Sequence, residues 1–420
     1  MVTPSPDQDG SSRFFLDIRP LRNAAFRRLW IGQGVSLIGF QLTAVAVPVQ
    51  VYELTGSSFW VGVLGVVGLV PLIVFGLWGG AVADHMDRRV LLVMSSCVGW
   101  VSTLALLVQA LLGLDQLWLI MVCVGVQSTG FAVASPTRGA IIPRLLPTAL
   151  VPAANTLNFT LTQAGVLLGP LLAGLILAGW PFAVAYGVDA VLFTAGLYAA
   201  LRLPALPPLG ETTGRPGLRS VIQGLGYLAG RPVLLMSFIV DIIAMGVALP
   251  RALFPEVADT QFGGGGAVGW LFASIGIGGL AGGLMSGWMG RVRRQGIALV
   301  AAIVVWGLAV AAAGLARQLW LAVLLLAVGG AADLVSGVFR QTILQTYAPD
   351  EMRGRLQGVF IVVVAGGPRL GDLRAGAMAS LTGVSVSWVG GGVACAVLVV
   401  AVSLCVPSFL RYEYAPRQDS

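Results

Sequence analysis

The sequence predicts an all-α membrane protein, with 12 transmembrane helices arranged in two pseudo-symmetric six-helix halves. Of its 420 residues, 57% are hydrophobic and only 10% are charged. Soluble domains carry about 25% charged residues, so this chain has too few to cover a water-facing surface. It also contains repeated apolar runs of roughly 20 residues, the length that crosses a bilayer.

The apolar runs divide the chain in order. Residues 1–28 form a polar N-terminal tail in which no cleavable signal peptide is apparent. The N-terminal half, 29–202, contains spans at about 29–53, 58–83, 90–113, 116–137, 151–178 and 182–202. The linker, 203–231, includes an amphipathic segment, 218–230, expected to lie along the inner membrane surface. The C-terminal half, 232–410, precedes a tail, 411–420, and contains spans at about 232–254, 266–289, 296–315, 318–340, 356–380 and 385–409.

The two halves correspond in sequence, which indicates a duplication. At an offset of 202 residues, five residues of the first half match the same residue types in the second: Arg138 with Arg340, Pro147 with Pro349, Gly165 with Gly367, Gly169 with Gly371, and Gly174 with Gly376. At an offset of 207, Gly62 falls on Gly269. We expect parallel repeats related by an axis along the membrane normal.

The basic residues are unevenly distributed. All 25 are arginines, and the net charge is +7. The predicted spans put all but four on one side of the membrane, the exceptions being Arg251, Arg317, Arg369 and Arg374. This positive-inside bias predicts that both termini are cytoplasmic in a multi-pass protein of the cytoplasmic (inner) membrane. It also argues against nucleic acid as the partner.

The composition disfavours an enzyme. His85 is the only histidine, and the four cysteines, Cys97, Cys123, Cys395 and Cys405, lie in apolar runs without metal-ligand spacing. A chain without lysine has no G-x-x-x-x-G-K-[ST] loop, so it does not use that route to ATP. We expect no metal, no cofactor and no catalytic residues.

Residues 76–89, GLWGGAVADHMDRR, form the most informative stretch. Gly76, Gly80 and Asp84 recur every four residues and share one helix face, and Arg88 and Arg89 follow where the apolar run stops. The pattern predicts a hinge between two membrane helices. His85 either replaces a basic residue at this junction or senses pH.

Gly80, Asp84, Arg88 and Arg89, between spans two and three of a 6+6 arrangement, resemble the loop motif G-x-x-x-D-R-x-G-R-R of the major facilitator superfamily. His85 and Asp87 depart from that motif. An aspartate at the position of Asp87 is common in one branch of the superfamily, which contains the enterobactin exporter and macrolide efflux proteins, and the chain resembles this branch. The segments that match this branch are AVPVQ at 46–50, LFPEVAD at 253–259 and QTYAPDEMRGRLQG at 345–358.

The resemblance implies alternating access, in which the halves rock about a central cavity and the loop-motif acid pairs with arginines to latch one conformation. It also implies a monomeric exporter of an amphipathic small molecule, a siderophore or a drug such as a macrolide. The acids inside the spans, described below, favour the proton as coupling ion. The alternatives are an uptake transporter or uniporter for a small organic solute, and a non-transporting membrane receptor.

A second motif lies in span five, where Gly165, Gly169, Pro170 and Gly174 resemble the G-P-x-x-G pattern of exporters in the superfamily. The glycines allow close helix packing and the proline bends the helix. The motif is therefore either a hinge that favours export or an ordinary packing contact.

Acids inside spans are costly and are therefore functional candidates. Asp241 in span seven, Asp333 in span ten and Asp189 in span six are each expected to carry a proton or bind substrate. The alternative is a structural acid that is paired with an arginine or hydrogen-bonded by hydroxyl groups.

Span eleven contains Arg369, Asp372 and Arg374 within an apolar run. The spacing predicts that Arg369 and Asp372 pair on one helix face, while Arg374 meets an acid on another helix or contacts the Asp84 region. These residues form either a packing network that gates the cavity or a site for an anionic substrate group.

Amides in spans one, four and five either line the cavity or join helices: Gln33, Gln41, Gln50, Gln127, Asn155, Asn158 and Gln163. Gln127 lies where proton-coupled drug exporters of the superfamily usually carry an arginine.

Overall fold

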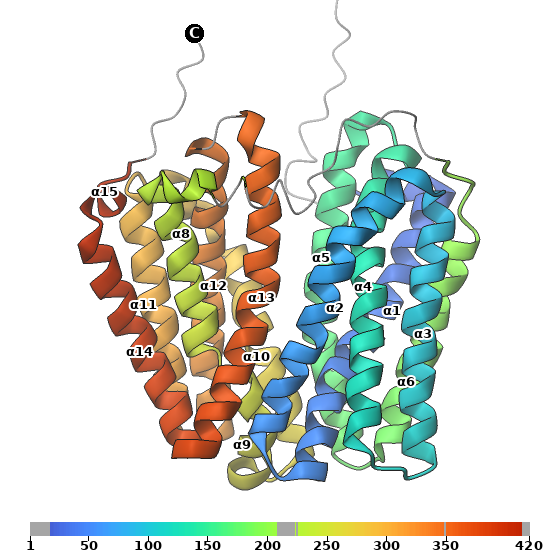
Figure 1. Ribbon diagram of the computed structural model, residues 1–420, viewed down its shortest axis with the longest axis horizontal. Coiled ribbons are helices and arrows are strands. Elements are labelled where there is room, and N and C mark those ends of the chain that lie inside the picture. The colour runs from blue at the N-terminus through green and yellow to red at the C-terminus, as the bar shows by residue number, and fades with distance from the viewer. Residues whose placement is uncertain (1–16, 208–222, 224–225, 348–349, 414–420) are drawn as a thin grey trace, which may run out of the picture.

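The computed structural model describes residues 17–207, 223, 226–347 and 350–413. Within these ranges the side chains of residues 77–85, 290, 345, 347, 350–355, 357–358 and 361–362 are not described. All regular secondary structure in the described ranges is helical. Figure 1 shows two bundles of long helices side by side, which confirms the all-α fold with two halves.

The first bundle contains α1 (Ala24–Thr55), α2 (Ser58–His85), α3 (Arg88–Leu111), α4 (Leu117–Leu145), α5 (Val151–Leu177) and α6 (Phe182–Leu201). Local sequence signals set its boundaries. The Asn23 side chain caps α1 by accepting hydrogen bonds from the N–H groups of Ala25 and Phe26. Gly56, with φ of 61°, ends α1 in the left-handed conformation that glycine adopts at low cost.

The second bundle contains α8 (Pro232–Ile243), α9 (Phe254–Phe262), α10 (Gly265–Leu284), α11 (Gln295–Gly314), α12 (Leu319–Tyr347), α13 (Asp350–Thr382), α14 (Val384–Cys405) and the short α15 (Pro407–Leu410). Eleven described segments are long and apolar enough to cross a membrane. The twelfth spanning helix is α13, whose hydropathy is lowered by its charged residues, Arg369, Asp372 and Arg374 among them. Large apolar side chains lie exposed on the outer helix surfaces, where lipid covers them in a membrane protein.

Span seven, predicted at about 232–254, is present but discontinuous, and it continues to Phe262. After α8 the chain forms a π-helical turn, Ala244–Ala248, followed by a 3₁₀ turn, Arg251–Leu253, and then α9. Pro250 lacks an N–H donor and disfavours helical geometry in the residue before it, which accounts for the break at Leu249. The Trp306 indole N–H donates to the Ala244 carbonyl at 3.2 Å and holds the turn against α11.

Two helices run further than their predicted spans. The fourth span was expected to end at 137 and the tenth at 340, but α4 continues to Leu145 and α12 to Tyr347. Arg138, predicted to lie just outside span four, and Arg340, predicted to end span ten, therefore both lie inside helices. The boundary error arose because an arginine within a helix resembles the end of a span.

The two halves meet through glycine contacts at one end of the bundle, which we call the closed end. Gly62 of α2 lies against the Asp372 carbonyl of α13, and Gly174 of α5 lies against Gly269 of α10, each too close for a side chain. From there α2 and α13 diverge toward the opposite end (Figure 1). We call that opposite end the loop-motif end, because Asp87 begins α3 there.

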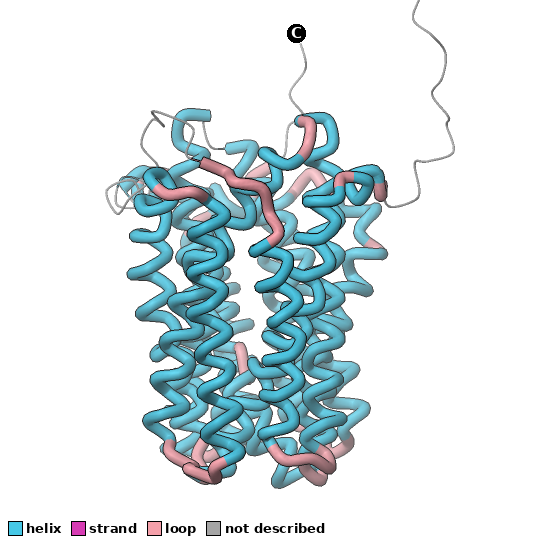
Figure 2. The backbone as a smooth tube through the Cα atoms, turned by 90° about the vertical axis from the view of Figure 1, so that its right-hand side faces the viewer, coloured by secondary structure: helices cyan, strands magenta, loops and turns pink. Residues whose placement is uncertain are grey.

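The glycine contacts follow the internal repeat. Gly376 of α13 lies against the backbone of Ser58 in α2, as its counterpart Gly174 lies against Gly269. The pair related by the 207-residue offset lies on the partner helices of these contacts: Gly62 on α2 packs against α13, and Gly269 on α10 packs against α5. Figure 2, turned by 90°, shows long helices that run between loops at the two ends. The duplication seen in the sequence thus places equivalent glycines at equivalent contacts between the halves.

Candidate functional site

A cavity of about 710 Å³ lies between the two halves and is lined by helices from both. Its polar lining residues are Gln41, Thr43, Gln127, Ser128, Gln163, Arg251, Asp333, Arg369 and Asp372. Its aromatic lining residues are Phe40, Phe131, Phe159, Phe272 and Trp306. A hollow with apolar walls and a few polar groups is the usual form of a small-molecule site.

Small and irregular residues create the space for this central cavity. Pro48 in α1, Pro170 in α5 and Pro368 in α13 all line it from within helices. Proline removes a helical hydrogen bond and bends the helix, and glycines such as Gly65 and Gly276 leave the wall without side chains. The bends and gaps prevent the two bundles from packing tightly along their full length.

The charged residues of α13 are arranged differently from the sequence prediction. Asp372 pairs with Arg251 of the broken span seven, at 2.9 Å, and not with Arg369. Arg369 reaches toward the first half, where a Cβ atom on Gly68 would lie 2.9 Å from its Nη1 and also 2.9 Å from Ser128 Oγ. Arg369 Nη1 is buried and donates to no acceptor among the described residues. The cavity wall therefore carries two guanidinium groups, of which only that of Arg251 forms an ion pair at hydrogen-bond distance.

Arg374 lies away from the central cavity. Its Nη1 donates to the Ser387 carbonyl of α14 at 3.3 Å, and Gly391 of α14 leaves space for the guanidinium. The sequence led us to expect an acid partner or a contact near Asp84. In this conformation Arg374 instead packs within the second half, on the part of α13 next to the closed end.

Two carboxylates and one arginine gather inside the second half. Asp241 of α8 forms a buried ion pair with Arg340 of α12, and the Arg340 guanidinium also stacks on the Phe360 ring, 5.3 Å from its centroid. Asp333 of α12 is within electrostatic range of both members of the pair and lines the central cavity. The cluster therefore connects a buried ion pair with the cavity surface.

Asp189 is fully buried in the first half, where hydroxyl groups solvate it. It accepts hydrogen bonds from Thr43 Oγ1 of α1 at 2.6 Å and from Thr103 Oγ1 of α3 at 3.4 Å. Gln127 of α4 donates to Thr103 at 3.3 Å, and both Thr43 and Gln127 line the central cavity. Gly39 leaves space for the carboxylate. This geometry connects a buried acid to the cavity through two polar side chains.

The loop motif is anchored within the first half. The Asp87 carboxylate accepts from the N–H groups of Arg89 at 2.8 Å and Leu206 at 2.9 Å. The guanidinium of Arg88 donates to the Ala140 carbonyl at 2.9 Å, and that of Arg89 to the Leu201 carbonyl at 2.7 Å. These contacts join α3 to α4 and to the end of α6. Three other residues of the motif are Gly80, Asp84 and His85. The side-chain environment of this part of α2 lies outside the described residues.

The glycine motif of α5 serves two contacts. Gly165 and Gly169 lie against Leu37 and Gln41 of α1 within the first half. Gly174 lies against Gly269 of the second half, and Pro170 lines the central cavity beside it. The motif therefore combines internal packing with contact between the halves, and a role as an export hinge stays a prediction.

The amides separate into two groups. Gln41, Gln127 and Gln163 line the central cavity. Gln50 is buried nearer the closed end, where it accepts hydrogen bonds from Gln109 at 3.1 Å and Tyr186 at 2.6 Å. The other three, Gln33, Asn155 and Asn158, are absent from the described lining of the cavity.

Sequence reasoning did not select four residues that the structure places at these sites. Arg251 and Arg340 were counted by the side of the membrane on which they lie, and Arg340 as a repeat partner of Arg138, although each forms an ion pair with a buried acid. Thr43 and Thr103 were not considered, since threonine is common in membrane helices. These residues share one signal: each is a basic or hydroxyl residue that lies inside a helix, at the same depth in the membrane as a buried acid.

The fold and the shared cavity define a transporter of the major facilitator type. Residues 17–418 match the family described as "Transmembrane secretion effector", so the chain belongs to this family. It is 27% identical to the enterobactin exporter EntS of Shigella boydii serotype 18 over 396 residues, 94% of each chain. The identity and coverage are the same for the enterobactin exporter EntS of Escherichia coli O81.

Solved structures agree on the fold. The chain is similar to the nucleoside transporter NupG, with a TM-score of 0.73, 14% identity, and coverage of 92% of this chain and 99% of that one. It is also similar to a bacterial homologue of the human lysosomal transporter Spinster, with a TM-score of 0.72, 14% identity, and coverage of 95% and 99%. The chain is thus a multi-pass membrane protein with the fold of a transporter.

Proposed function

We propose that this protein is a secondary active exporter of an amphipathic organic molecule, a siderophore or a drug such as a macrolide. The observation that carries the proposal is the central cavity, which both halves line and which the glycine contacts shut off at one end. A rocking motion that opens the closed end and brings the other ends of the halves together exposes the same cavity to the opposite side. One chain supplies the whole cavity, so the transporter works as a monomer.

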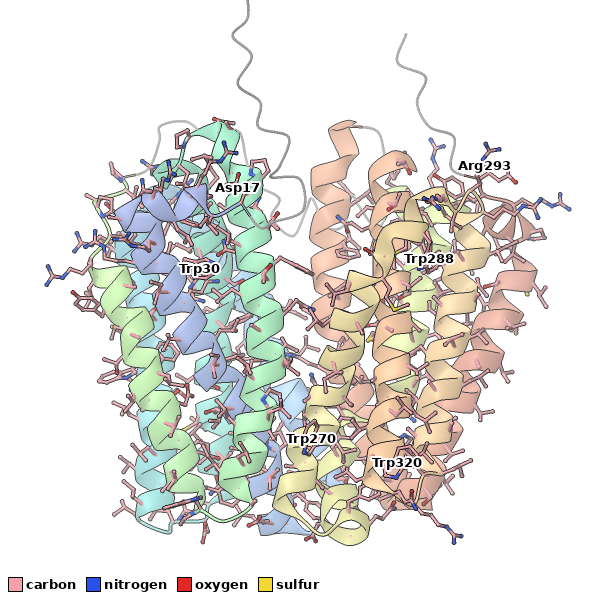
Figure 3. All side chains as sticks on the ribbon, turned by 180° about the vertical axis from the view of Figure 1, so that it is seen from behind. Asp17, Trp30, Trp270, Trp288, Arg293 and Trp320 are labelled. Atoms are coloured by element: carbon pink, nitrogen blue, oxygen red, sulfur yellow. The ribbon has the colours of Figure 1, made fainter. Side chains whose placement is uncertain are left out.

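The arginine distribution supports an orientation of the protein in the membrane that suits an exporter. Arg293 lies at the same end of the bundle as Asp17, and Trp320 lies at the other end (Figure 3). The arginines of the loop motif, Arg88 and Arg89, begin α3 at the end where Arg293 lies. By the positive-inside rule this end is cytoplasmic, as are both termini. The halves are then separated on the cytoplasmic side, where an exporter loads its substrate.

Proton coupling is supported by the cluster of Asp241, Asp333 and Arg340. One guanidinium cannot neutralise two carboxylates, and a buried charge without a partner is costly. Asp333 lines the cavity, so it can exchange a proton with water there while the cavity is open. A change in the exposure of Asp333 between the two conformations couples the proton to the motion. We therefore propose antiport of a proton against the substrate.

The nature of the substrate is supported by the cavity lining and by the relatives. Aromatic and aliphatic walls with scattered amides and charged groups fit a molecule that is partly apolar and partly polar. The relatives named above are enterobactin exporters, and enterobactin fits the siderophore class of the proposal.

The test is transport by purified protein in liposomes with an imposed pH gradient. Lumenal pH is followed with a trapped dye while enterobactin and macrolides are added one at a time to the wild type, Asp333→Asn and Asp241→Asn. Arg317→Gln, an exposed substitution outside the cavity, serves as the matched control.

We expect substrate-triggered proton flux in the wild type and in Arg317→Gln, and its loss in Asp333→Asn. Flux that survives in both aspartate variants rules out this cluster as the coupling site. Substrate movement that is independent of the pH gradient indicates a uniporter, and accumulation in the opposite direction indicates uptake. Binding without transport points to a receptor.

A further inference from the structure

Arg369 is a charged side chain of the central cavity that has no role in the proposed proton coupling. Among the described residues that line the cavity, the basic ones are Arg251 and Arg369. Arg251 donates to Asp372 at 2.9 Å and is thereby neutralised. Arg369 Nη1 is buried and has no hydrogen-bond partner in the described part of the chain. An unsatisfied buried guanidinium is costly, so its presence requires an explanation.

The pairing of Asp372 explains why Arg369 stays unpaired. Arg369 and Asp372 are three residues apart on α13, a spacing at which ion pairs form readily. Arg251 occupies Asp372 Oδ2 from the broken span seven. The Arg369 side chain extends across the cavity wall instead, to the place where Gly68 of α2 leaves room beside Ser128 of α4. Asp372 is within electrostatic range of Arg369 as well, so one carboxylate faces two guanidinium groups and the cavity wall keeps an excess positive charge. The fold directs the Arg369 guanidinium to the boundary between the halves.

Aromatic side chains line the same cavity as Arg369. Phe40 of α1 and Phe131 of α4 stack with ring centroids 5.4 Å apart at an interplanar angle of 10°. Both line the cavity, as do Phe272 and Trp306 from the second half. Aromatic walls bind flat apolar rings through stacking and edge contacts. A guanidinium binds a carboxylate or phenolate through charge-assisted hydrogen bonds, which are roughly twice as strong as neutral ones.

We propose that Arg369 is the anchor for an anionic group of the substrate, and that the preferred substrates are aromatic acids or phenolates. The anion pairs with the Arg369 guanidinium from the cavity side, and the ring lies against the aromatic walls. The inference rests on the proposed function, because it takes the central cavity as the substrate site. It adds that a negative charge on the substrate is recognised, and it names the residue responsible.

The test compares two probes of the same shape, 2-naphthoate and its neutral counterpart 2-naphthamide. Binding is measured by titration calorimetry with the full chain in nanodiscs of zwitterionic lipid. The variants are Arg369→Gln, which removes the charge, and Arg369→Met, which removes it while keeping an extended side chain. Arg374→Gln is the matched control, because Arg374 is a half-buried arginine of the same helix that faces α14.

We expect the wild type and Arg374→Gln to bind naphthoate about tenfold more tightly than naphthamide, a difference of about 1.4 kcal/mol. In both Arg369 variants the preference is expected to fall to within about twofold, with naphthamide binding unchanged. Unchanged naphthamide binding shows that the cavity is intact. The inference is overturned if the wild type shows no preference, which includes no binding of either probe, or if the Arg369 variants keep it.

The two proposals fail separately. Proton-linked transport of siderophores or macrolides without any preference for the anionic probe leaves the exporter in place and removes the role of Arg369. The reverse result is an anion preference that depends on Arg369 in a protein that transports none of those compounds in liposomes. It keeps the role of Arg369 and removes the proposed export function.

Discussion

Arg340 is the residue on which the buried charges of the second half depend. It pairs with Asp241, stacks on Phe360 and is within electrostatic range of Asp333. Removing one member of a buried ion pair leaves the other without compensation, and this typically costs about 3–5 kcal/mol. The contribution of Arg340 to stability is therefore expected to exceed that of either aspartate.

The first prediction concerns this pair. Arg340→Gln is expected to lower the unfolding free energy by about 3–5 kcal/mol, because Asp241 loses its cation. Asp241→Asn should cost less, since Asp333 is still near Arg340. The double variant should recover part of the loss. Unfolding of the detergent-solubilised protein by heat checks this, with exposed Arg317→Gln as control, and equal losses for the two single variants contradict it.

A second prediction concerns the hydroxyl groups around Asp189. Thr43→Val removes the donor of the 2.6 Å hydrogen bond, and hydrogen bonds to charged groups contribute about 1.5–3 kcal/mol. We expect a clear drop in the unfolding midpoint for Thr43→Val and little change for Thr43→Ser, which keeps the hydroxyl. The same midpoint for both variants would show that this hydrogen bond contributes nothing to stability.

The sequence identified the buried acids but not their partners. Asp189, Asp241 and Asp333 were selected because an acid in an apolar run is conspicuous against its neighbours. Arg340 was not selected because it lies at an expected span end. Thr43 was not selected because threonine is common in membrane helices. Partner identity depends on which helices pack together, and no local pattern in the chain specifies that.

At the scale of the elements, the sequence predicted the helices well and their interruptions poorly. Hydropathy marks eleven spans among the described residues, because every spanning segment must bury its backbone polar groups in helical hydrogen bonds. In the twelfth, α13, charged residues weaken this signal. The break in span seven occurs where protein surrounds the backbone, so the apolar run continues through it. The π-helical turn and the 3₁₀ turn bring Arg251 to the cavity, which an unbroken helix does not predict.

The third prediction tests the crossing of α5 and α10. Gly269→Leu is expected to force these helices apart, because Gly174 and the Pro170 carbonyl lie where the new side chain would extend. Distances between spin labels at the closed end should then increase. The control is Gly179→Ala. Gly179 follows Gly174 closely in sequence, but a Cβ atom there would meet no other atom within 4 Å. Unchanged distances in Gly269→Leu would mean that this crossing does not hold the closed end.

At the scale of the whole molecule, the closed end joins the halves through polar contacts as well as glycines. The Ser58 hydroxyl at the start of α2 donates to the Glu256 carboxylate of α9. A second hollow of about 760 Å³ lies beside it and is lined by both halves, with Glu53, Asp115 and Asp259 among the lining residues. Opening this end separates these groups.

The fourth prediction is that a covalent bond across the closed end stops transport. In a variant whose native cysteines are replaced, Ser58→Cys and Glu256→Cys are expected to be joined by a short bifunctional methanethiosulfonate reagent. The reagent spans the gap that the shorter cysteine leaves where the long Glu256 side chain reaches Ser58. Transport in liposomes should cease on cross-linking and return on reduction. Each single cysteine variant serves as a control that should not respond. Transport by the cross-linked protein would contradict alternating access through this end.

The contacts between the halves have a consequence for how such proteins diversify. At Gly62, Gly269 and Gly376, main chain meets main chain, so these three contacts hold no side chain that selection could alter. The cavity wall, by contrast, contains many side chains that can be exchanged one at a time. In the proposed cycle, a new substrate can therefore be acquired in small steps while these contacts stay the same.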